Sequence, residues 1–159
     1  MSPPSKLATV AGVSAAVVLG VAAGAMLAEA GVLVPWWRFL PAEAFLIWYS
    51  ENASRLLAFY GPLEIVAAAL ALGAAAVGGR GAGRPWFVIA AALAVGILLL
   101  FPLYFQRANA AFADGSVAPD EVAAALRRWA GWHLARTGMG LAACVAAVLG
   151  VRADAGGRR

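Results

Sequence analysis

The sequence predicts an all-α protein, a transmembrane four-helix bundle. Of its 159 residues, 64% are hydrophobic and 13% are charged, whereas soluble domains average about 45–50% apolar and about 25% charged residues. Long apolar stretches alternate with short polar or glycine-rich segments, which is typical of membrane-spanning helices. A soluble domain of this size could not bury so much apolar surface, because its surface is large relative to its core. We expect one transmembrane domain over residues 1–159.

The spans are expected at about 7–34, 52–77, 85–105 and 132–151. At ~1.5 Å per residue, each can cross a hydrocarbon core of ~30 Å. The first begins like a signal peptide, with Lys6 before the apolar run and Ala28-Glu29-Ala30 late in it. It is longer than the apolar part of a signal peptide, about 7–15 residues, so we expect a retained helix. Cleavage stays the alternative.

The connectors differ in character. The segment Pro35-Trp36-Trp37-Arg38 is expected to end the first helix and to open an aromatic connector that runs to about Ser50, at the membrane–water interface. A glycine-rich turn follows the second span at 78–85, and a loop is expected at 113–118. Pro119 and two acids then open an amphipathic helix start, 119–131, so that the fourth helix is long.

The net charge of +4 comes from scattered residues, mostly arginine. Nucleic-acid binding is not expected, because it needs a clustered basic surface; the expected partner is the lipid bilayer of a bacterial-type inner or plasma membrane. With four alternating spans, the termini and the second loop share one side, which holds Lys6, Arg80, Arg84, Arg152, Arg158 and Arg159. The other side holds Arg38, Arg55, Arg107, Arg127, Arg128 and Arg136. The count alone does not decide orientation. Because several arginines of the second group are expected inside helices, we expect both termini in the cytoplasm.

Cysteine and histidine usage narrows the cofactor chemistry. Cys144 is the single cysteine and lies in an apolar run, so neither an intrachain disulfide nor a CxxC pair can form. A single histidine excludes bis-histidine haem ligation and a two-histidine iron site within one chain. We expect no metal and no cofactor, although a site shared across a homo-oligomer stays open.

Polar residues within the apolar pattern gather at one end of the expected bundle. They are Glu29, Asn52, Arg55, Tyr60, Glu64, Tyr104, Gln106, Arg107, Asn109, Trp129, Trp132, His133 and Arg136. Glu64 lies about 18 Å along its helix from Asn52 at the usual rise, and should therefore be paired or protonated. Arg136 is the expected partner, because a guanidinium can bind a carboxylate with two hydrogen bonds.

We take His133, Arg136 and Glu64 as the candidate catalytic residues, with His133 as a candidate general base. The candidate substrate-binding residues are Asn109, Tyr60, Tyr104, Trp129, Trp132 and Arg55. Each has a plainer interpretation. The Glu64–Arg136 pair can simply hold two helices in register, the tryptophans can anchor the chain at the interface, and His133 can be a hydrogen-bonded structural residue.

The end of the third span and the start of the fourth resemble a known family. The stretch from Pro102 to Asn109 is followed by Trp129, Trp132, His133 and Arg136 in a Trp-x-x-Trp-His-x-x-Arg pattern. This pattern resembles the anthrone-oxygenase-like family of small four-helix integral membrane proteins, largely a domain of unknown function. The resemblance implies a four-helix membrane domain, and some members oxidise polycyclic anthrones to anthraquinones without metal or flavin. In such chemistry His133 would be the base, and Arg136 or Asn109 would stabilise the oxyanion.

Three functions remain open on the sequence. The first is a membrane enzyme that binds or oxidises an apolar, aromatic or quinone-like small molecule. The second is a carrier whose buried Glu64 titrates. The third is a structural or accessory membrane protein in which the polar cluster sets helix register. A closed cavity lined by Glu64, His133 and Arg136 favours the first. A water path from Glu64 towards either face, or one made by a dimer, favours the second, and direct Glu64–Arg136 packing without a void favours the third.

Overall fold

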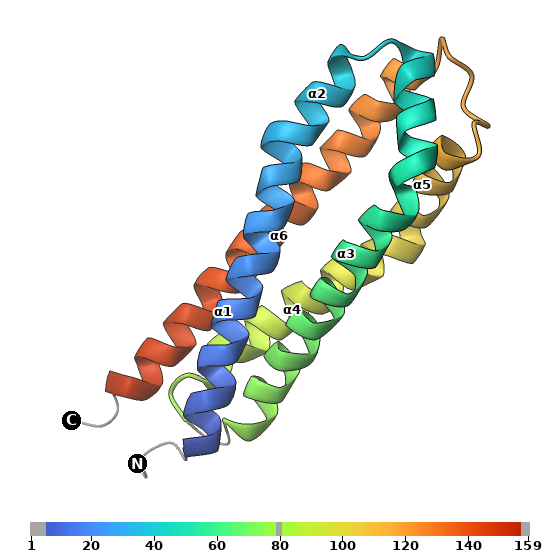
Figure 1. Ribbon diagram of the computed structural model, residues 1–159. Coiled ribbons are helices and arrows are strands. Elements are labelled where there is room, and N and C mark those ends of the chain that lie inside the picture. Colours follow the sequence, from blue (N-terminus) through green and yellow to red (C-terminus); the bar gives the residue numbers. More distant parts are fainter. Residues whose placement is uncertain (1–5, 79–80, 157–159) are drawn as a thin grey trace.

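A computed structural model describes residues 6–78 and 81–156 of the chain. All regular secondary structure in these two ranges is helical, and four helical rods are long and apolar enough to cross a membrane. The rods are Lys6–Phe39, Ala42–Val77, Arg84–Ala113 and Val122–Gly156. The rods run antiparallel in sequence order, and both chain ends lie at the same end of the bundle (Figure 1). The predicted four-helix membrane bundle is confirmed. Of the residues in the predicted turn and charge count, Gly79, Arg80, Arg158 and Arg159 lie outside the described ranges.

Two of the rods change helix type along their length. The first consists of α1 (Lys6–Ala28), the π-helix η1 (Glu29–Leu33) and α2 (Val34–Phe39). The third consists of α4 (Arg84–Leu100), the π-helix η2 (Phe101–Phe105) and α5 (Gln106–Ala113). The second and fourth rods are single helices, α3 (Ala42–Val77) and α6 (Val122–Gly156).

The expected extent of the aromatic connector was wrong. Residues 34–39 are helical, the break is confined to Leu40 and Pro41, and α3 already begins at Ala42. Pro35 is tolerated because it lies in the first turn of α2, where the hydrogen-bond pattern is already changing from π to α. The aromatic side chains therefore stand on two facing helices. Trp37 is buried, and its ring packs against Phe45, Trp48 and Tyr49.

The loop before the fourth rod also differs slightly from expectation. Residues 119–121 form a turn, and α6 begins at Val122 instead of Pro119. The helix is nevertheless long, as predicted, and extends 35 residues to Gly156.

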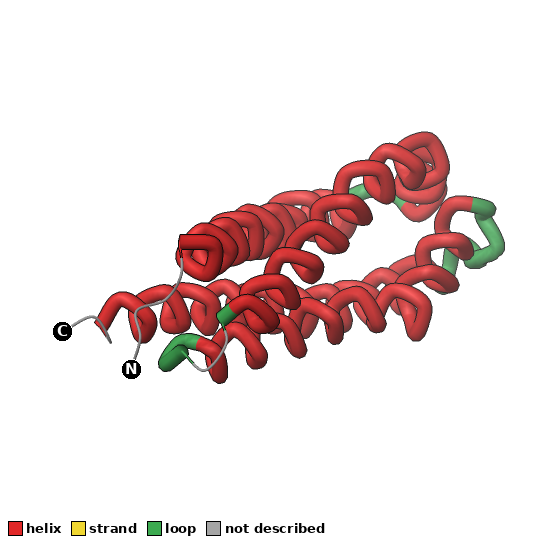
Figure 2. The backbone as a smooth tube through the Cα atoms, turned by 90° about the horizontal axis from the view of Figure 1, so that it is seen from below, coloured by secondary structure: helices red, strands yellow, loops and turns green. Residues whose placement is uncertain are grey.

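Each long helix packs on two neighbours around the bundle. α6 packs against α1 and α4, and α3 packs against the same two helices, so that α3 and α6 face each other diagonally. Figure 2 shows the rods from a second direction. At the end that carries the chain termini, the Gly83 amide donates a hydrogen bond of 2.6 Å to the Asp154 carboxylate and so ties the start of α4 to the end of α6.

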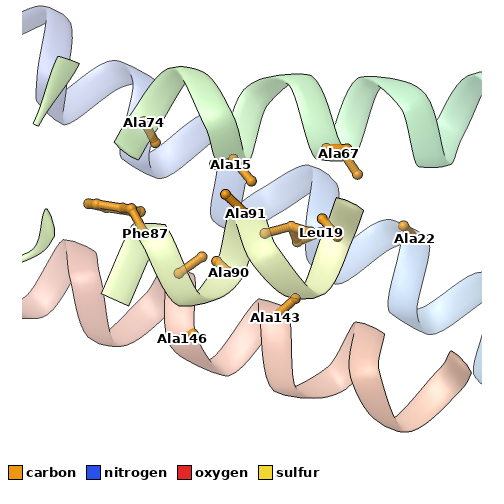
Figure 3. Packing of buried hydrophobic residues seen from close by; sticks show 14 residues of the cluster. Ala15, Leu19, Ala22, Ala67, Ala74, Phe87, Ala90, Ala91, Ala143 and Ala146 are labelled. Carbon is orange, nitrogen blue, oxygen red and sulfur yellow. The ribbon is translucent and has the colours of Figure 1, made fainter. Parts of the chain in front are cut away.

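The half of the bundle nearest the termini has a core of small side chains. Alanines from all four long helices meet there, joined by Leu19 and Phe87 (Figure 3). Small residues let membrane helices approach closely, and packing then holds them together. The Phe87 ring lies between Gly12 of α1 and Gly150 of α6, where a Cβ on either glycine would come within 3.0 Å of ring atoms.

The opposite half has an aromatic core. Its buried members are Val34, Trp37, Phe45, Tyr49, Phe105, Phe112, Val122, Leu126 and Trp129. Between the two cores lies one level of the bundle at which three of the helices contribute polar side chains. That level holds Glu29 of η1, Glu64 of α3, and His133 and Arg136 of α6.

Candidate functional site

Four polar side chains are buried between the two cores. The exposed fractions are 3% for Glu29, 8% for Glu64, 1% for His133 and 6% for Arg136. An ionisable group inside a membrane bundle is costly, by ~2.5–3.5 kcal/mol on insertion scales, and it usually faces the protein interior and a partner. The four groups are close enough to compensate one another.

Arg136 lies between two carboxylates. Its Nη1 is 3.5 Å from Glu64 Oε1, and its Nη2 is 3.7 Å from Glu29 Oε2. The structure thus brings together the predicted Glu64–Arg136 pair, but not as a two-bond fork on one carboxylate, because the guanidinium is shared. The central guanidinium carbon of Arg136, Cζ, also lies 4.5 Å from the centre of the Phe105 ring, which is a cation–π contact.

Two π-helices lie on the rods beside this group, and Glu29 is the first residue of η1. In η1 the Val34 amide bonds to the Glu29 carbonyl, and in η2 the Gln106 amide bonds to the Phe101 carbonyl. A turn closed over five residues contains one residue more than an α-turn, so it changes the direction of the side chains that follow. Such single turns are frequent at functional sites. Pro102 gives η2 a local cause, because proline lacks the amide that a regular α-ladder requires.

His133 lies behind Arg136 and not at an open surface. Its Nε2 is 3.0 Å from the Met26 carbonyl oxygen, and its Nδ1 is 3.3 Å from Nη2 of Arg136. The Trp129 ring stacks on the imidazole with 4.9 Å between centroids and 13° between planes. The Trp129 indole donates a hydrogen bond of 2.8 Å to the Asn109 side-chain oxygen. Asn109, Trp129, His133 and Arg136 therefore form a continuous series of contacts from α5 into α6.

A cavity of about 670 Å³ lies beside the polar group. This volume falls in the range of small-molecule sites, about 300–1,000 Å³, which are mostly apolar with a few placed polar groups. Its lining residues are Glu29, Tyr49, Ala53, Ser54, Leu56, Leu57, Tyr60, Gly61, Glu64, Ile65, Leu98, Phe101, Gln106, Asn109, Ala110, Ala113, Trp129 and Arg136. The cavity is partly open along α3, where Leu57 and Ile65 are more than half exposed.

Three of the lining side chains carry buried polar atoms without a hydrogen-bond partner in the described part of the chain. The atoms are Glu29 Oε2, Glu64 Oε1 and Arg136 Nε. Buried polar groups are normally hydrogen-bonded, so orphaned ones call for an explanation such as a bound water, an ion or a ligand. These atoms are enclosed among the side chains of the wall, and the two carboxylate oxygens lie 3.7 Å and 3.5 Å from the Arg136 guanidinium.

The predicted site residues divide into two sets. Glu64, Arg136, Asn109, Tyr60 and Trp129 line the cavity. His133, Tyr104, Trp132 and Arg55 are not among its lining residues. Tyr104 stacks on Trp132 and borders a second hollow between α5 and α6, and the Arg55 guanidinium hydrogen-bonds to Asn52 on the same helix.

Glu29 and Tyr49 line the cavity but were not among the predicted catalytic or substrate-binding residues. Glu29 contacts both Arg136 and the His133 ring, and its only signal was that it is the sole charged residue within the first apolar stretch. Tyr49 gave no signal apart from its aromatic neighbourhood. Within the described ranges, no group of three or more histidine, cysteine, aspartate or glutamate side chains is arranged to hold a metal ion.

A comparison with family models identifies the family of this chain. The model of the family described as anthrone oxygenase matches residues 53–146, more than half of the chain. The chain belongs to the anthrone oxygenase family. The match includes Glu64, Asn109, Trp129, His133 and Arg136, and it begins after Glu29. The resemblance seen in the sequence is thereby confirmed. Comparisons with curated proteins and with solved structures give no match.

The four residues of the Trp-x-x-Trp-His-x-x-Arg pattern lie within the anthrone oxygenase family match, and they occupy different positions around the cavity. Trp129 and Arg136 line the cavity, His133 lies behind them, and Trp132 is 43% exposed on the outer face of α6. The spacing of three and four residues puts these side chains on adjacent faces of one helix. The pattern thus combines a cavity wall with its support.

Proposed function

We propose that this anthrone oxygenase family member is a membrane-embedded enzyme that binds a flat polycyclic aromatic ketone of the anthrone type and oxidises it with dioxygen. The observation that carries the proposal is a largely apolar cavity that has the ionisable residues Glu29, Glu64 and Arg136 among its lining residues. A void beside Arg136 favours a small-molecule site over a purely structural ion pair.

The proposed reaction begins with removal of a proton. The methylene group opposite an anthrone carbonyl is acidic, because the resulting carbanion is delocalised onto the carbonyl oxygen. A carboxylate of Glu29 or Glu64 accepts the proton, and Arg136 donates to the enolate oxygen. The proposal does not assign this proton transfer to His133, because His133 is not among the lining residues of the cavity.

Dioxygen is the oxidant and completes the balance. The carbanion forms a carbon–oxygen bond with dioxygen, and the peroxide takes a proton to give a hydroperoxide. Loss of water from the hydroperoxide breaks the oxygen–oxygen bond and leaves a second carbonyl. One methylene group and one dioxygen thus become one carbonyl and one water. The protein contributes the base, the oxyanion partner and an apolar environment that strengthens both.

The substrate is expected to enter from the lipid. The open part of the cavity lies along α3, where Leu57 and Ile65 face outward with exposed fractions of 54% and 59%. In a bilayer these side chains meet acyl chains. A poorly water-soluble aromatic molecule would reach the site by this route without leaving the membrane.

Oxygen uptake and quinone absorbance can test the proposal. Protein in lipid nanodiscs is given 1,8-dihydroxyanthrone, with empty nanodiscs as the measure of spontaneous oxidation. We expect the wild-type protein to catalyse quinone formation. The rate should fall by ~100-fold or more when glutamine replaces whichever of Glu29 and Glu64 is the base, and it should be nearly abolished in a Glu29→Gln/Glu64→Gln double variant. Glu51→Gln, the same change at an exposed site on α3, should leave the rate intact. A double variant that oxidises the anthrone at the wild-type rate would overturn the proposed mechanism.

A further inference from the structure

We propose that His133 is a positioning residue that holds the Arg136 guanidinium against the cavity, and that it takes no proton from substrate. This inference rests on the proposed function for its consequence in catalysis. Its structural part, a fixed imidazole tautomer, stands on the contacts around the ring alone.

The neighbours of the two ring nitrogens differ in kind. Arg136 can only donate hydrogen bonds, so Nδ1, at 3.3 Å from its Nη2, must be the acceptor. The Met26 carbonyl can only accept, so Nε2, at 3.0 Å from it, must carry the hydrogen. A single form of the ring, the neutral imidazole with hydrogen on Nε2, satisfies both contacts.

Two further neighbours of Nε2 agree with this assignment. The Thr137 hydroxyl donates its hydrogen to the His133 carbonyl at 2.8 Å, so its oxygen can only accept toward Nε2, 3.5 Å away. Glu29 Oε2 lies 3.7 Å from the same nitrogen. Every contact of Nε2 in the described chain is thus an acceptor, and the one contact of Nδ1 is a donor.

The ring is also fixed in its plane. Trp129 stacks on it, and Asn109 holds the Trp129 indole from α5. Because Asn109 and Trp129 line the cavity and His133 does not, the histidine occupies the layer behind the wall. Its Nδ1 lone pair points to Arg136 and is not available to a bound molecule. What it supplies is the angle at which the guanidinium meets Glu29, Glu64 and a substrate oxygen.

Nuclear magnetic resonance can read the tautomer directly, because the chain contains a single histidine. Protein labelled with ¹⁵N-histidine in nanodiscs is expected to show a protonated Nε2 and an unprotonated Nδ1 with no exchange between tautomers. Arg136→Gln should disturb the Nδ1 signal. Arg127→Gln, at an exposed site nearer the start of the same helix, should not. Hydrogen on Nδ1, or a doubly protonated ring at neutral pH, would overturn the proposal.

Activity supplies the second arm, in the anthrone assay above. His133→Ala is expected to lower kcat/KM by about 10- to 100-fold, the usual effect of losing a group that orients a reacting one. His133→Asn should retain most of the wild-type rate, because the amide oxygen can accept from Arg136 in place of Nδ1. Equal loss in both variants, with both folded, would mean that the imidazole itself exchanges protons and would overturn the proposal. If the wild-type protein oxidises no anthrone, the proposed function fails, and the tautomer measurement still decides the positioning role.

Discussion

At the scale of single residues, Arg136 links more of the site than any other side chain described. It contacts Glu29, Glu64, His133 and the Phe105 ring, and it lines the cavity. A buried ion pair adds little net stability, but removal of one partner leaves an uncompensated charge. The polar group should therefore be tolerant of complete replacement and intolerant of partial replacement.

Arg136→Met tests this asymmetry. The change leaves the two carboxylates without a cation and puts an apolar side chain between them. We expect the free energy of unfolding to fall by about 3 kcal/mol. This is the lower end of the range for a broken buried pair, because the cavity is partly open. The measurement is thermal unfolding in detergent, followed by circular dichroism. A Glu29→Gln/Glu64→Gln/Arg136→Met variant should recover most of the loss. If the single variant unfolds at the wild-type temperature, the guanidinium does not compensate the two carboxylates.

Part of the site could be predicted from the sequence because helical spacing is regular. The alternation of the four spans places Glu64, Arg136, Asn109, Tyr60 and Trp129 at the same end of the bundle, and the chemistry of the guanidinium pairs Arg136 with Glu64. Glu29 was expected in the same polar group, but its ion pair with Arg136 joins two different rods and follows from no spacing within one helix. The nitrogen roles of His133 depend on Met26, far away in the sequence. Neither can be read from spacing alone.

At the scale of the helices, the fold could be predicted because long apolar runs outweigh other signals. The aromatic stretch from Pro35 to Ser50 misled the prediction for a physical reason. Tryptophan and tyrosine are favoured both at membrane interfaces and in buried helix contacts, so composition does not separate a connector from two facing helices. The observed break occupies only Leu40 and Pro41.

Helix packing near the termini depends on where glycines lie, not on how many there are. A Cβ on Gly150 would come within 2.9–3.0 Å of three Phe87 ring atoms, whereas a Cβ on Gly138 would meet nothing within 4 Å. Both glycines lie on α6, so the same substitution at each gives a matched pair.

We expect Gly150→Ala to destabilise the bundle by about 1–3 kcal/mol through overpacking against the buried Phe87 ring. Gly138→Ala should be neutral or stabilising, because alanine favours helix over glycine by about 1 kcal/mol. Unfolding of the two variants in the same detergent provides the measurement. Adding Phe87→Leu to Gly150→Ala should relieve the strain. Equal stabilities of the two alanine variants would show that α4 and α6 do not approach as described.

At the scale of the whole molecule, the open question is which end faces the cytoplasm. At the end away from the termini, the connections 40–41 and 114–121 contain no lysine or arginine, and the arginines of that half lie inside helices. At the other end, Lys6 and Arg84 are the first residues of α1 and α4. The positive-inside rule counts residues in loops and near span ends, and Arg38 and Arg107 lie close to the ends of their rods. The distribution therefore does not decide the orientation, and cytoplasmic termini stay a prediction.

Cysteine labelling of intact bacterial cells can decide the orientation. On a Cys144→Ala background, Ser116→Cys lies in the exposed loop before α6, and Ala82→Cys lies in the exposed turn before α4. With cytoplasmic termini, a membrane-impermeant maleimide should label the first variant in intact cells and the second only after lysis. The site would then lie toward the outer half of the bilayer, because the cavity is on the Ser116 side of the alanine core. Labelling of Ala82→Cys in intact cells, with Ser116→Cys protected, would reverse the orientation and move the expected substrate entry to the cytoplasmic leaflet.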